Sequence, residues 1–400
     1  MKFLPKVIFY CIFVGIVCNM IKLYFSQNDL ETISFEEVYP WYFKLGFFGN
    51  IFISIASVAS FIYYKKYFPT YISVCYILLL LFVTLSSYND LGQFLKRPTF
   101  FYSLKGIGTY LNFGLLFFAA DTYYFPKIIK VFYYFSFGVI IASLIKLGKV
   151  GLGASRKEYL TAIRDFVVYL IWVFPFFFLQ DEENKKKNLI NIIAFMVIFL
   201  LILSTGARSY LLIYFIYVIA KFKDQLKTKN ALLGILSFIV LLGIFYIIII
   251  NTEFSKTFET ALNNLSERSG EDTRSDQLMD FFSQYDFDYL IQGVGPIKQW
   301  YWTGIGAYYS YLDNQILLMA WWAGLPAILT YCYFLVKSLF IKSEILLFEN
   351  IKGTKIILGI WLLACFGMAI YISICCDPYY YFLSLIIGLN ACQYSKLIEP

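Results

Sequence analysis

Residues 230–250 read NALLGILSFIVLLGIFYIIII, a run of 21 residues without a charged side chain. A helix of about 20 apolar residues crosses the roughly 30 Å hydrocarbon core of a bilayer. Lipid offers no hydrogen bonds to the backbone, so a run of this kind has to satisfy its own N–H and C=O groups as a helix. The run is therefore expected to be a membrane-spanning helix.

The same rule, applied outward from this run, predicts an all-α, polytopic membrane protein with about twelve spans. Residues 1–250 hold the first nine spans, 251–313 form one large extracytoplasmic loop, and 314–400 hold the last three. The first span is expected to be retained, because no cleavage pattern of small residues follows it. The predicted spans are 5–25, 41–64, 69–88, 101–120, 129–148, 161–180, 189–205, 208–221, 230–250, 314–336, 357–375 and 379–395.

Composition excludes the other broad classes. Hydrophobic residues make up 60% of the chain and charged residues 15%, whereas a soluble domain has about 45–50% and 25%. The chain has no histidine, so a histidine base or a histidine-ligated metal is impossible. The eight cysteines all lie in or beside apolar stretches without metal-ligand spacing, which indicates neither a zinc site nor a disulfide framework.

Basic residues predict the orientation and separate by type. With the N-terminus inside, 18 of the 27 lysines fall on cytoplasmic segments, as the positive-inside rule requires, and the C-terminus is cytoplasmic too. All six arginines fall on the outer side: Arg97, Arg156, Arg164, Arg208, Arg268 and Arg274. The planar fork of arginine suits carboxylate or phosphate. The split favours an anionic ligand at the outer face, with chance placement of a rare residue as the alternative.

The 63-residue loop 251–313 contains ten carboxylates and four basic residues together with many aromatic side chains. Its stretch 276–285 predicts a short amphipathic helix, and Gly293-Val-Gly295 before a proline predicts a turn. The cluster Trp300-Tyr301-Trp302 has two interpretations. It is either an interfacial aromatic belt or a stacking surface for sugar rings.

Several short motifs follow one another along residues 204–325. They are Ser204-Thr-Gly-Ala-Arg208, then Arg274, Gly293-Val-Gly295, Asp313-Asn314 and Gly324-Leu325. In this order, and around one large external loop, they resemble those of the O-antigen ligase/polymerase superfamily. The ligase branch uses a loop histidine at the position that Asp313 occupies here. Because this chain has no histidine, the resemblance points to the polymerase branch.

The resemblance implies a membrane glycosyltransferase that polymerises polyprenyl-diphosphate-linked oligosaccharide repeats at the outer face of the bacterial inner membrane. It implies no cofactor, metal, nucleotide sugar or nucleic acid, and it implies a flippase and a chain-length regulator as partner proteins. Breaking the anomeric bond builds negative charge on the diphosphate, which arginine forks stabilise, and the acceptor hydroxyl needs a proton acceptor. The predicted catalytic residues are Asp313, Arg208 and Arg274. The predicted substrate-binding residues are Arg268, Arg156, Arg164, Arg97, Asn314, Trp300, Trp302, Gly293 and Gly295.

Other hypotheses remain at this stage. The protein could be a ligase that transfers finished glycan to lipid A core, a multispan flippase of the lipid-linked repeat, or a scaffold of an export complex. A flippase usually shows two similar halves and short loops, whereas this chain has no internal repeat and one loop of 63 residues. For single residues, Asp313 could be the N-cap of the helix that follows it, and Arg208 could simply snorkel at a helix end.

Overall fold

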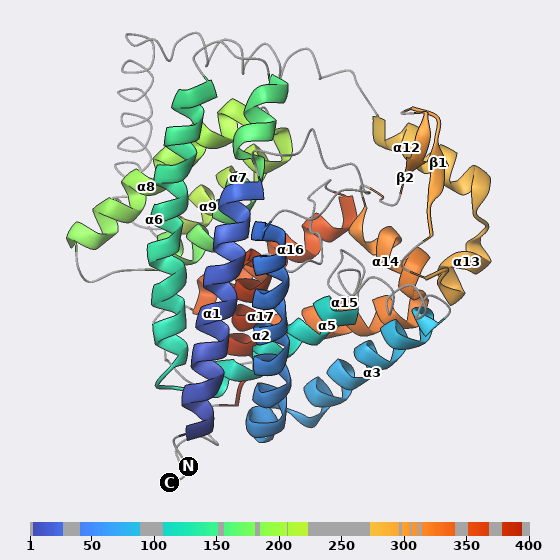
Figure 1. Cartoon of the computed structure of the whole chain (residues 1–400), viewed down its shortest axis with the longest axis horizontal. Coiled ribbons are helices and arrows are strands. Elements are labelled where there is room, and N and C mark those ends of the chain that lie inside the picture. The colour runs from blue at the N-terminus through green and yellow to red at the C-terminus, as the bar shows by residue number, and fades with distance from the viewer. Residues whose placement is uncertain are drawn as a thin grey trace. The chain divides into compact units, whose positions relative to one another are not determined.

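The structure is a computed structural model that describes residues 3–26, 41–88, 107–150, 156–180, 185–205, 207–222, 273–295, 298–304, 306–309, 312, 314–340, 351–367 and 378–393. Within these ranges nearly all secondary structure is helical (Figure 1). The helices before residue 230 are α1 Phe3–Ser26, α2 Trp41–Tyr64, η1 Lys65–Tyr67, α3 Thr70–Ser86, α5 Ile107–Asn112, η4 Phe113–Ala120, α6 Phe125–Val150, α7 Arg156–Leu179, α8 Lys185–Thr205 and α9 Arg208–Phe222. The later elements are α12 Thr273–Gln284, α13 Phe287–Gln292, β1 Trp300–Trp302, β2 Ala307–Tyr309, α14 Gln315–Ala323, α15 Leu325–Phe340, α16 Ile351–Gly367 and α17 Pro378–Ala391.

The predicted class of an all-α membrane protein is confirmed. Among the described residues, five helices are long and apolar enough to cross a membrane. They cover Phe3–Phe25, Trp41–Tyr67, Phe125–Val150, Ala162–Leu179 and Lys185–Thr205. The apolar run 230–250 and the first part of the predicted loop, 251–272, lie outside the described residues.

Two predicted spans are not single α-helices. The predicted span 314–336 is broken into α14 and α15 at Gly324, whose φ of +85° ends the first helix. Pro326 then fits the first turn of α15, where its missing N–H removes no helical bond. The predicted span 101–120 contains α5 followed by η4, a 3₁₀-helix of eight residues. A 3₁₀-helix of this length is uncommon because its hydrogen-bond geometry is poor.

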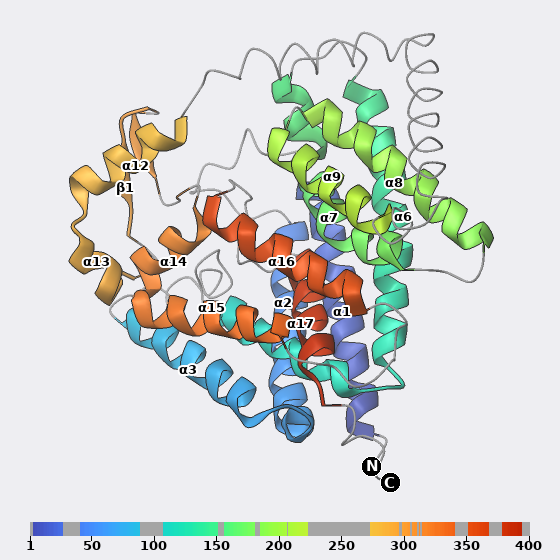
Figure 2. The ribbon, with the colours of Figure 1, turned by 180° about the vertical axis from the view of Figure 1, so that it is seen from behind.

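The described residues divide into two compact units. The first comprises 1–22, 38–131 and 272–400, and the second comprises 23–37 and 132–271. In the first unit α1 and α2 run side by side (Figure 1), and α3 packs along α15 (Figure 2).

A buried polar network joins the helices of the first unit. The Nδ2 atom of Asn19 donates to Oδ1 of Asn50 at 3.2 Å, and the same oxygen accepts a hydrogen bond from the Tyr381 hydroxyl on α17. One turn further along α2, the Ser54 hydroxyl donates to Oδ1 of Asn112 at 2.6 Å. Amides in an apolar interior are costly unless hydrogen-bonded, so these contacts fix which faces of the helices meet.

The second unit packs α7 against α8 and α9. Residues 166–179 of α7 are all buried. At the end of this helix, Nδ2 of Asn191 donates to the backbone oxygen of Phe177 at 3.2 Å, which satisfies one of the last carbonyls that a helix leaves unpaired. The Asn191 side chain also accepts from the Tyr133 hydroxyl at 3.0 Å.

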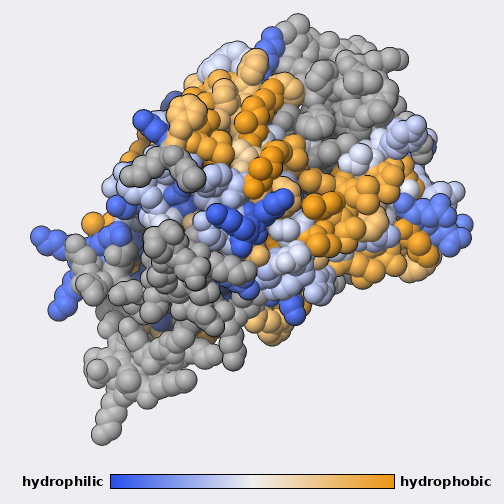
Figure 3. Space-filling view, turned by 90° about the horizontal axis from the view of Figure 1, so that it is seen from below, coloured by the Kyte–Doolittle hydropathy of each residue, from blue (hydrophilic) through white to orange (hydrophobic). Residues whose placement is uncertain are grey.

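Apolar side chains are also abundant on the surface. On the face that Figure 3 shows, orange apolar side chains cover broad areas between smaller polar regions. Outward-facing residues of the long helices include Ile55 and Ile62 on α2 and Ile141 on α6, each more than half exposed. In water such surfaces promote association, whereas in lipid they are the ordinary outer faces of spanning helices.

Candidate functional site

The turn motif of the predicted loop is hydrogen-bonded to the helix that begins after Asn314. The backbone N–H of Val294 donates to the carbonyl of Trp321 at 2.8 Å, and that of Gly295 donates to the carbonyl of Trp322 at 3.1 Å. These carbonyls belong to the last turn of α14, where no intrahelical donor remains. The loop therefore caps the C-terminal end of α14. We call this contact the Gly293–Gly324 clasp.

Two glycines make the clasp possible. Gly293 and Gly324 have φ values of +78° and +85°, in a region that other residues rarely adopt. A Cβ atom on Gly293 would lie 2.7 Å from the backbone nitrogen of Gly324. Close backbone approach and positive φ thus both require glycine here. Gly293 is the C-cap of α13, and Gly295 also has a positive φ, at +90°.

The N-terminal end of α14 is capped by Asn314. Its Oδ1 atom accepts the backbone N–H of Leu317 at 3.0 Å, which is the usual N-cap bond. The hypothesis that Asp313 is the N-cap is therefore wrong, because its neighbour fills that position. The side chain of Asp313 itself lies outside the described residues.

The first residue of α14 carries a buried amide. Gln315 is 5% exposed, and within the described part of the chain its Nε2 atom has no hydrogen-bond partner. Helical side chains lean toward the N-terminus of their helix, so this amide lies over the same end of α14 as the Asn314 cap. Gln315 is not among the predicted site residues, because a glutamine in an apolar span belongs to no motif.

The region from Thr273 to Tyr309 folds as a small unit, which we call the loop lobe. It contains α12, α13 and an antiparallel hairpin of β1 and β2. The predicted amphipathic helix at 276–285 is confirmed by α12. The hairpin was not predicted.

Side chains of α12 hold the hairpin in place. The Gln284 amide binds both backbone groups of Tyr301: its Nε2 donates to the carbonyl at 2.6 Å, and its Oε1 accepts the N–H at 2.8 Å. Asp280 accepts the backbone N–H of Thr303 at 3.0 Å and also the Thr303 hydroxyl. Gln284 thus replaces a third strand at an edge that would otherwise remain unpaired.

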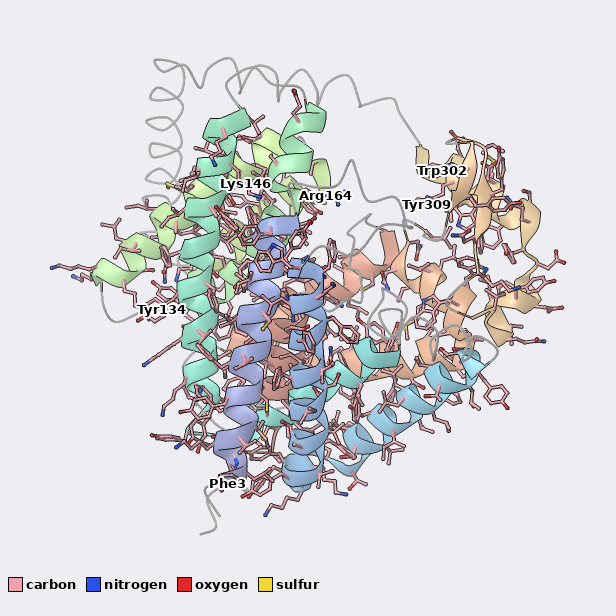
Figure 4. All side chains as sticks on the ribbon, viewed as in Figure 1. Phe3, Tyr134, Lys146, Arg164, Trp302 and Tyr309 are labelled. Atoms are coloured by element: carbon pink, nitrogen blue, oxygen red, sulfur yellow. The ribbon has the colours of Figure 1, made fainter. Side chains whose placement is uncertain are left out.

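The two tryptophans that were predicted to bind substrate lie on the inner face of the hairpin. Trp300 is 1% exposed, and its ring meets Phe281 edge-on at 5.8 Å. Trp302 is half-buried, and its ring centroid lies 5.2 Å from that of Tyr309; both residues are labelled in Figure 4. Both faces of Trp300 are therefore covered in this structure, and Trp300 is a core residue of the loop lobe.

The same aromatic core reaches the broken helix. Tyr285 and Phe281 pack against Trp321 of α14 at 5.4 and 5.6 Å. Burial raises the pKa of the Tyr285 phenol, and the neighbouring Tyr289 raises it further. Tyr285 therefore stays neutral at ordinary pH and donates to the carbonyl of Gln299 at 3.0 Å. The loop lobe and α14 are joined by ring contacts as well as by the clasp.

Three of the predicted arginines lie at helix starts. The helix α7 begins at Arg156, α9 begins at Arg208, and Arg274 is the second residue of α12. A helix N-terminus carries a partial positive charge that favours anions and disfavours cations. The side chains of these three residues lie outside the described residues, as do Arg97 and Arg268 entirely.

Arg164 is the one predicted arginine whose side chain is described. Its Nε atom contacts Oδ1 of Asp165 at 3.2 Å, with each side chain about one-third exposed. Lys146 lies in the same unit, on α6 (Figure 4), and donates to the carbonyl of Tyr24 at 2.9 Å. Arg164 is therefore partly neutralised by its neighbour, which weakens its case as a primary ligand for an anion.

The predicted site residues thus fall into both units. Arg274, Gly293, Gly295, Asn314 and the two tryptophans belong to the first unit, and Arg156, Arg164 and Arg208 to the second. Within the first unit, the structure brings Gly293 and Gly295 to the end of the helix that Asn314 caps. Among the described residues, no three His, Cys, Asp or Glu side chains lie together as metal ligands.

No protein-family model, no curated protein and no solved structure matches this chain.

Proposed function

We propose that this protein polymerises oligosaccharide repeats carried on a polyprenyl diphosphate, at the outer face of the bacterial inner membrane. The observation that carries the proposal is the position of Arg156, Arg208 and Arg274 in the first turns of three helices. An arginine there is repelled by the helix dipole, and a bound anion relieves that repulsion. Helix N-termini are ready-made sites for phosphate groups.

The loop lobe supports the same proposal. It is attached by the Gly293–Gly324 clasp to the C-terminal end of α14, the helix whose N-terminal end Asn314 caps. A transferase needs such pre-organisation, because misplacement of a reacting group by about 1 Å costs on the order of 100-fold in rate. Asp313 directly precedes the Asn314 cap, and it serves in the proposal as the proton acceptor for the attacking hydroxyl.

Charge development defines the roles of the arginines. When the anomeric bond breaks, the leaving diphosphate gains negative charge. Arg208 and Arg274 are each proposed as a source of forked donors, and a donor that binds the leaving diphosphate more tightly in the transition state than in the ground state meets the condition for catalysis. Deprotonation of the acceptor hydroxyl by a carboxylate completes the transfer without a nucleotide sugar.

The experiment that tests the proposal is deletion of the gene, followed by analysis of the surface polysaccharide. Loss of long chains with single repeats retained supports polymerisation. Loss of all repeats points to a flippase or a ligase, and an unchanged polysaccharide contradicts the proposal. Purified protein should also extend a lipid-diphosphate-linked repeat in the presence of a chelator and without sugar nucleotide, whereas a requirement for either would place the chemistry in another enzyme class.

A further inference from the structure

Two aromatic rings of the loop lobe lie on its surface. Tyr301 is 40% exposed and Tyr308 is 70% exposed. They are directly opposite each other in the hairpin, with ring centroids 5.5 Å apart and ring planes at 76°. The two rings therefore form a corner, one ring beside the other, on the face opposite the buried Trp300.

Backbone hydrogen bonds fix the positions of Tyr301 and Tyr308. Both hydrogen-bonding groups of Tyr301 are bound by Gln284, and the turn that follows is bound by Asp280 through Thr303. Pairing with β1 positions Tyr308. A surface whose backbone is fixed before binding loses little conformational entropy when a ligand arrives. Two tyrosines on a rigid hairpin suit such a surface, because each has only two side-chain torsions to order.

Formal charge separates the possible occupants. Between Thr273 and Tyr309 the loop lobe has four aspartates against Arg274 and Lys298, a formal net charge of −2. A net negative charge disfavours an anionic lipid headgroup as the occupant of the two rings. A neutral ligand with apolar faces and many hydroxyls is not repelled. Sugar rings have this chemistry, since their C–H faces pack on aromatic rings and their hydroxyls exchange hydrogen bonds with phenols.

The phenol groups are available for this purpose. Within the described residues, neither the Tyr301 nor the Tyr308 hydroxyl has a hydrogen-bond partner in the protein, and both rings are exposed. Each phenol can donate one hydrogen bond and accept others. We propose that Tyr301 and Tyr308 form a stacking site for a neutral stretch of glycan. That the glycan is the growing polymer rests on the proposed function.

The site is separate from the residues proposed to carry out transfer. It binds sugar and takes no part in bond breaking, so its loss should weaken the grip on the chain while single transfers continue. The expected consequence in cells is a shift from long to short polymer, with single-repeat products still extended. This phenotype differs from the complete loss of polymer expected when a catalytic residue is removed.

The test measures binding by the purified full-length protein. The probe is the surface polysaccharide of the producing strain, released from its lipid by mild acid, and the readout is saturation-transfer NMR together with a titrated Kd. Tyr301→Ala and Tyr308→Ala should each weaken binding about tenfold or less, and the double variant by more, because aromatic contacts contribute about 0.5–1.5 kcal/mol beyond area. The phenylalanine variants keep the rings and should retain most of the binding.

Phe287→Ala is the matched control, because Phe287 is 67% exposed on α13 of the same lobe. It should bind the polysaccharide as the wild type does. Equal polysaccharide binding by the wild type and the double alanine variant would overturn the proposal. The proposal would also be overturned if the tyrosine variants and Phe287→Ala all lost binding to phosphatidylglycerol vesicles, because such a result is expected of a membrane-contact surface. The two proposals can also fail separately. If the tyrosine variants bind glycan less tightly but deletion of the gene leaves long chains, the glycan site is retained and polymerisation is rejected.

Discussion

Gly293 and Gly324 meet backbone to backbone: a Cβ atom on Gly293 would lie 2.7 Å from the nitrogen of Gly324, and one on Gly324 would lie 2.9 Å from the carbonyl oxygen of Gln292. These residues are 31 positions apart in the sequence. One lies in the loop lobe and the other breaks a predicted membrane span. Their contact is the structural link between the loop and the helix that begins beside Asp313.

The clasp predicts a hierarchy among glycine substitutions. Gly306 also has positive φ, at +64°, but nothing lies within 4 Å of its missing Cβ, so Gly306→Ala should cost only the conformational strain of about 1–2 kcal/mol. Gly293→Ala and Gly324→Ala add a backbone clash and should lower the free energy of unfolding further. Thermal unfolding in detergent measures both. Equal losses at Gly293 and Gly306 would contradict the clasp.

Asp313 and Asn314 are expected to separate catalysis from stability. Asp313→Asn removes the proton acceptor and should abolish polymer, since general base catalysis contributes about 100- to 10,000-fold, while the melting temperature stays unchanged. Asn314→Ala removes the cap and should cost about 1 kcal/mol of stability, and Asn314→Asp should restore it. Polymer length and thermal unfolding are measured on the same preparations. Full-length polymer made by Asp313→Asn would rule out the base.

Arg208 and Arg274 test geometry against charge. Lysine keeps the charge of arginine but lacks its paired donors. A hydrogen bond to a charged group contributes about 1.5–3 kcal/mol, which is roughly 10- to 150-fold in rate if it forms only in the transition state. Arg274→Lys and Arg208→Lys should each shorten the polymer, and Arg274→Ala should leave single repeats. Wild-type polymer from both lysine variants would mean that no forked contact to diphosphate exists.

The predicted orientation is open to a direct test. A reporter fused after Gly270 should be extracytoplasmic, and one fused after Lys227 should be cytoplasmic, because the lysines of 221–229 lie on the inner side of the predicted topology. Alkaline phosphatase and green fluorescent protein fusions report the two sides. A cytoplasmic Gly270 would contradict the proposed function, because the proposal places polymerisation at the outer face.

Substitution of Gln315 is expected to increase the stability of the protein. Its buried Nε2 atom lacks a partner among the described residues, and an unsatisfied buried donor costs about 1–3 kcal/mol. Gln315→Leu has a similar volume and should raise the free energy of unfolding by about 1 kcal/mol. If the variant is more stable but makes less polymer, the amide serves substrate binding. A less stable variant would show that the amide has a structural partner.

The sequence predicted elements whose signal is local. The span 41–64 coincides with α2 because its apolar length alone defines it, and the end of α13 at Gly293 agrees with the interruption that the closely spaced glycines predict. The break at Gly324 was missed, although Gly324-Leu-Pro326 is a C-cap glycine followed by a first-turn proline. Hydropathy, averaged over a window, hides such a break.

The sequence also contains a pattern that is typical of the hairpin. Aromatic strands on either side of a short glycine-containing connection, Trp300–Trp302 and Ala307–Tyr309, are typical of a hairpin. Which ring would be buried did not follow from this pattern. Trp300 packs against Phe281 of α12, and Phe281 in turn packs against Trp321 of α14. Long-range contacts of this kind decide burial, and a single sequence does not contain them.

The hydrogen bond between Tyr381 and Asn50 has a consequence for biogenesis. The two residues are 331 positions apart, so at about 5–20 residues per second the ribosome makes Tyr381 roughly 17–66 s after Asn50. Asn50 has two hydrogen-bond partners, Asn19 and Tyr381, and during that interval only Asn19 has been synthesised. The newly inserted pair of α1 and α2 must therefore wait in the bilayer, or beside an insertase, with its asparagine cluster incomplete. Arrival of the last helix closes the cluster and commits the first unit to its final assembly.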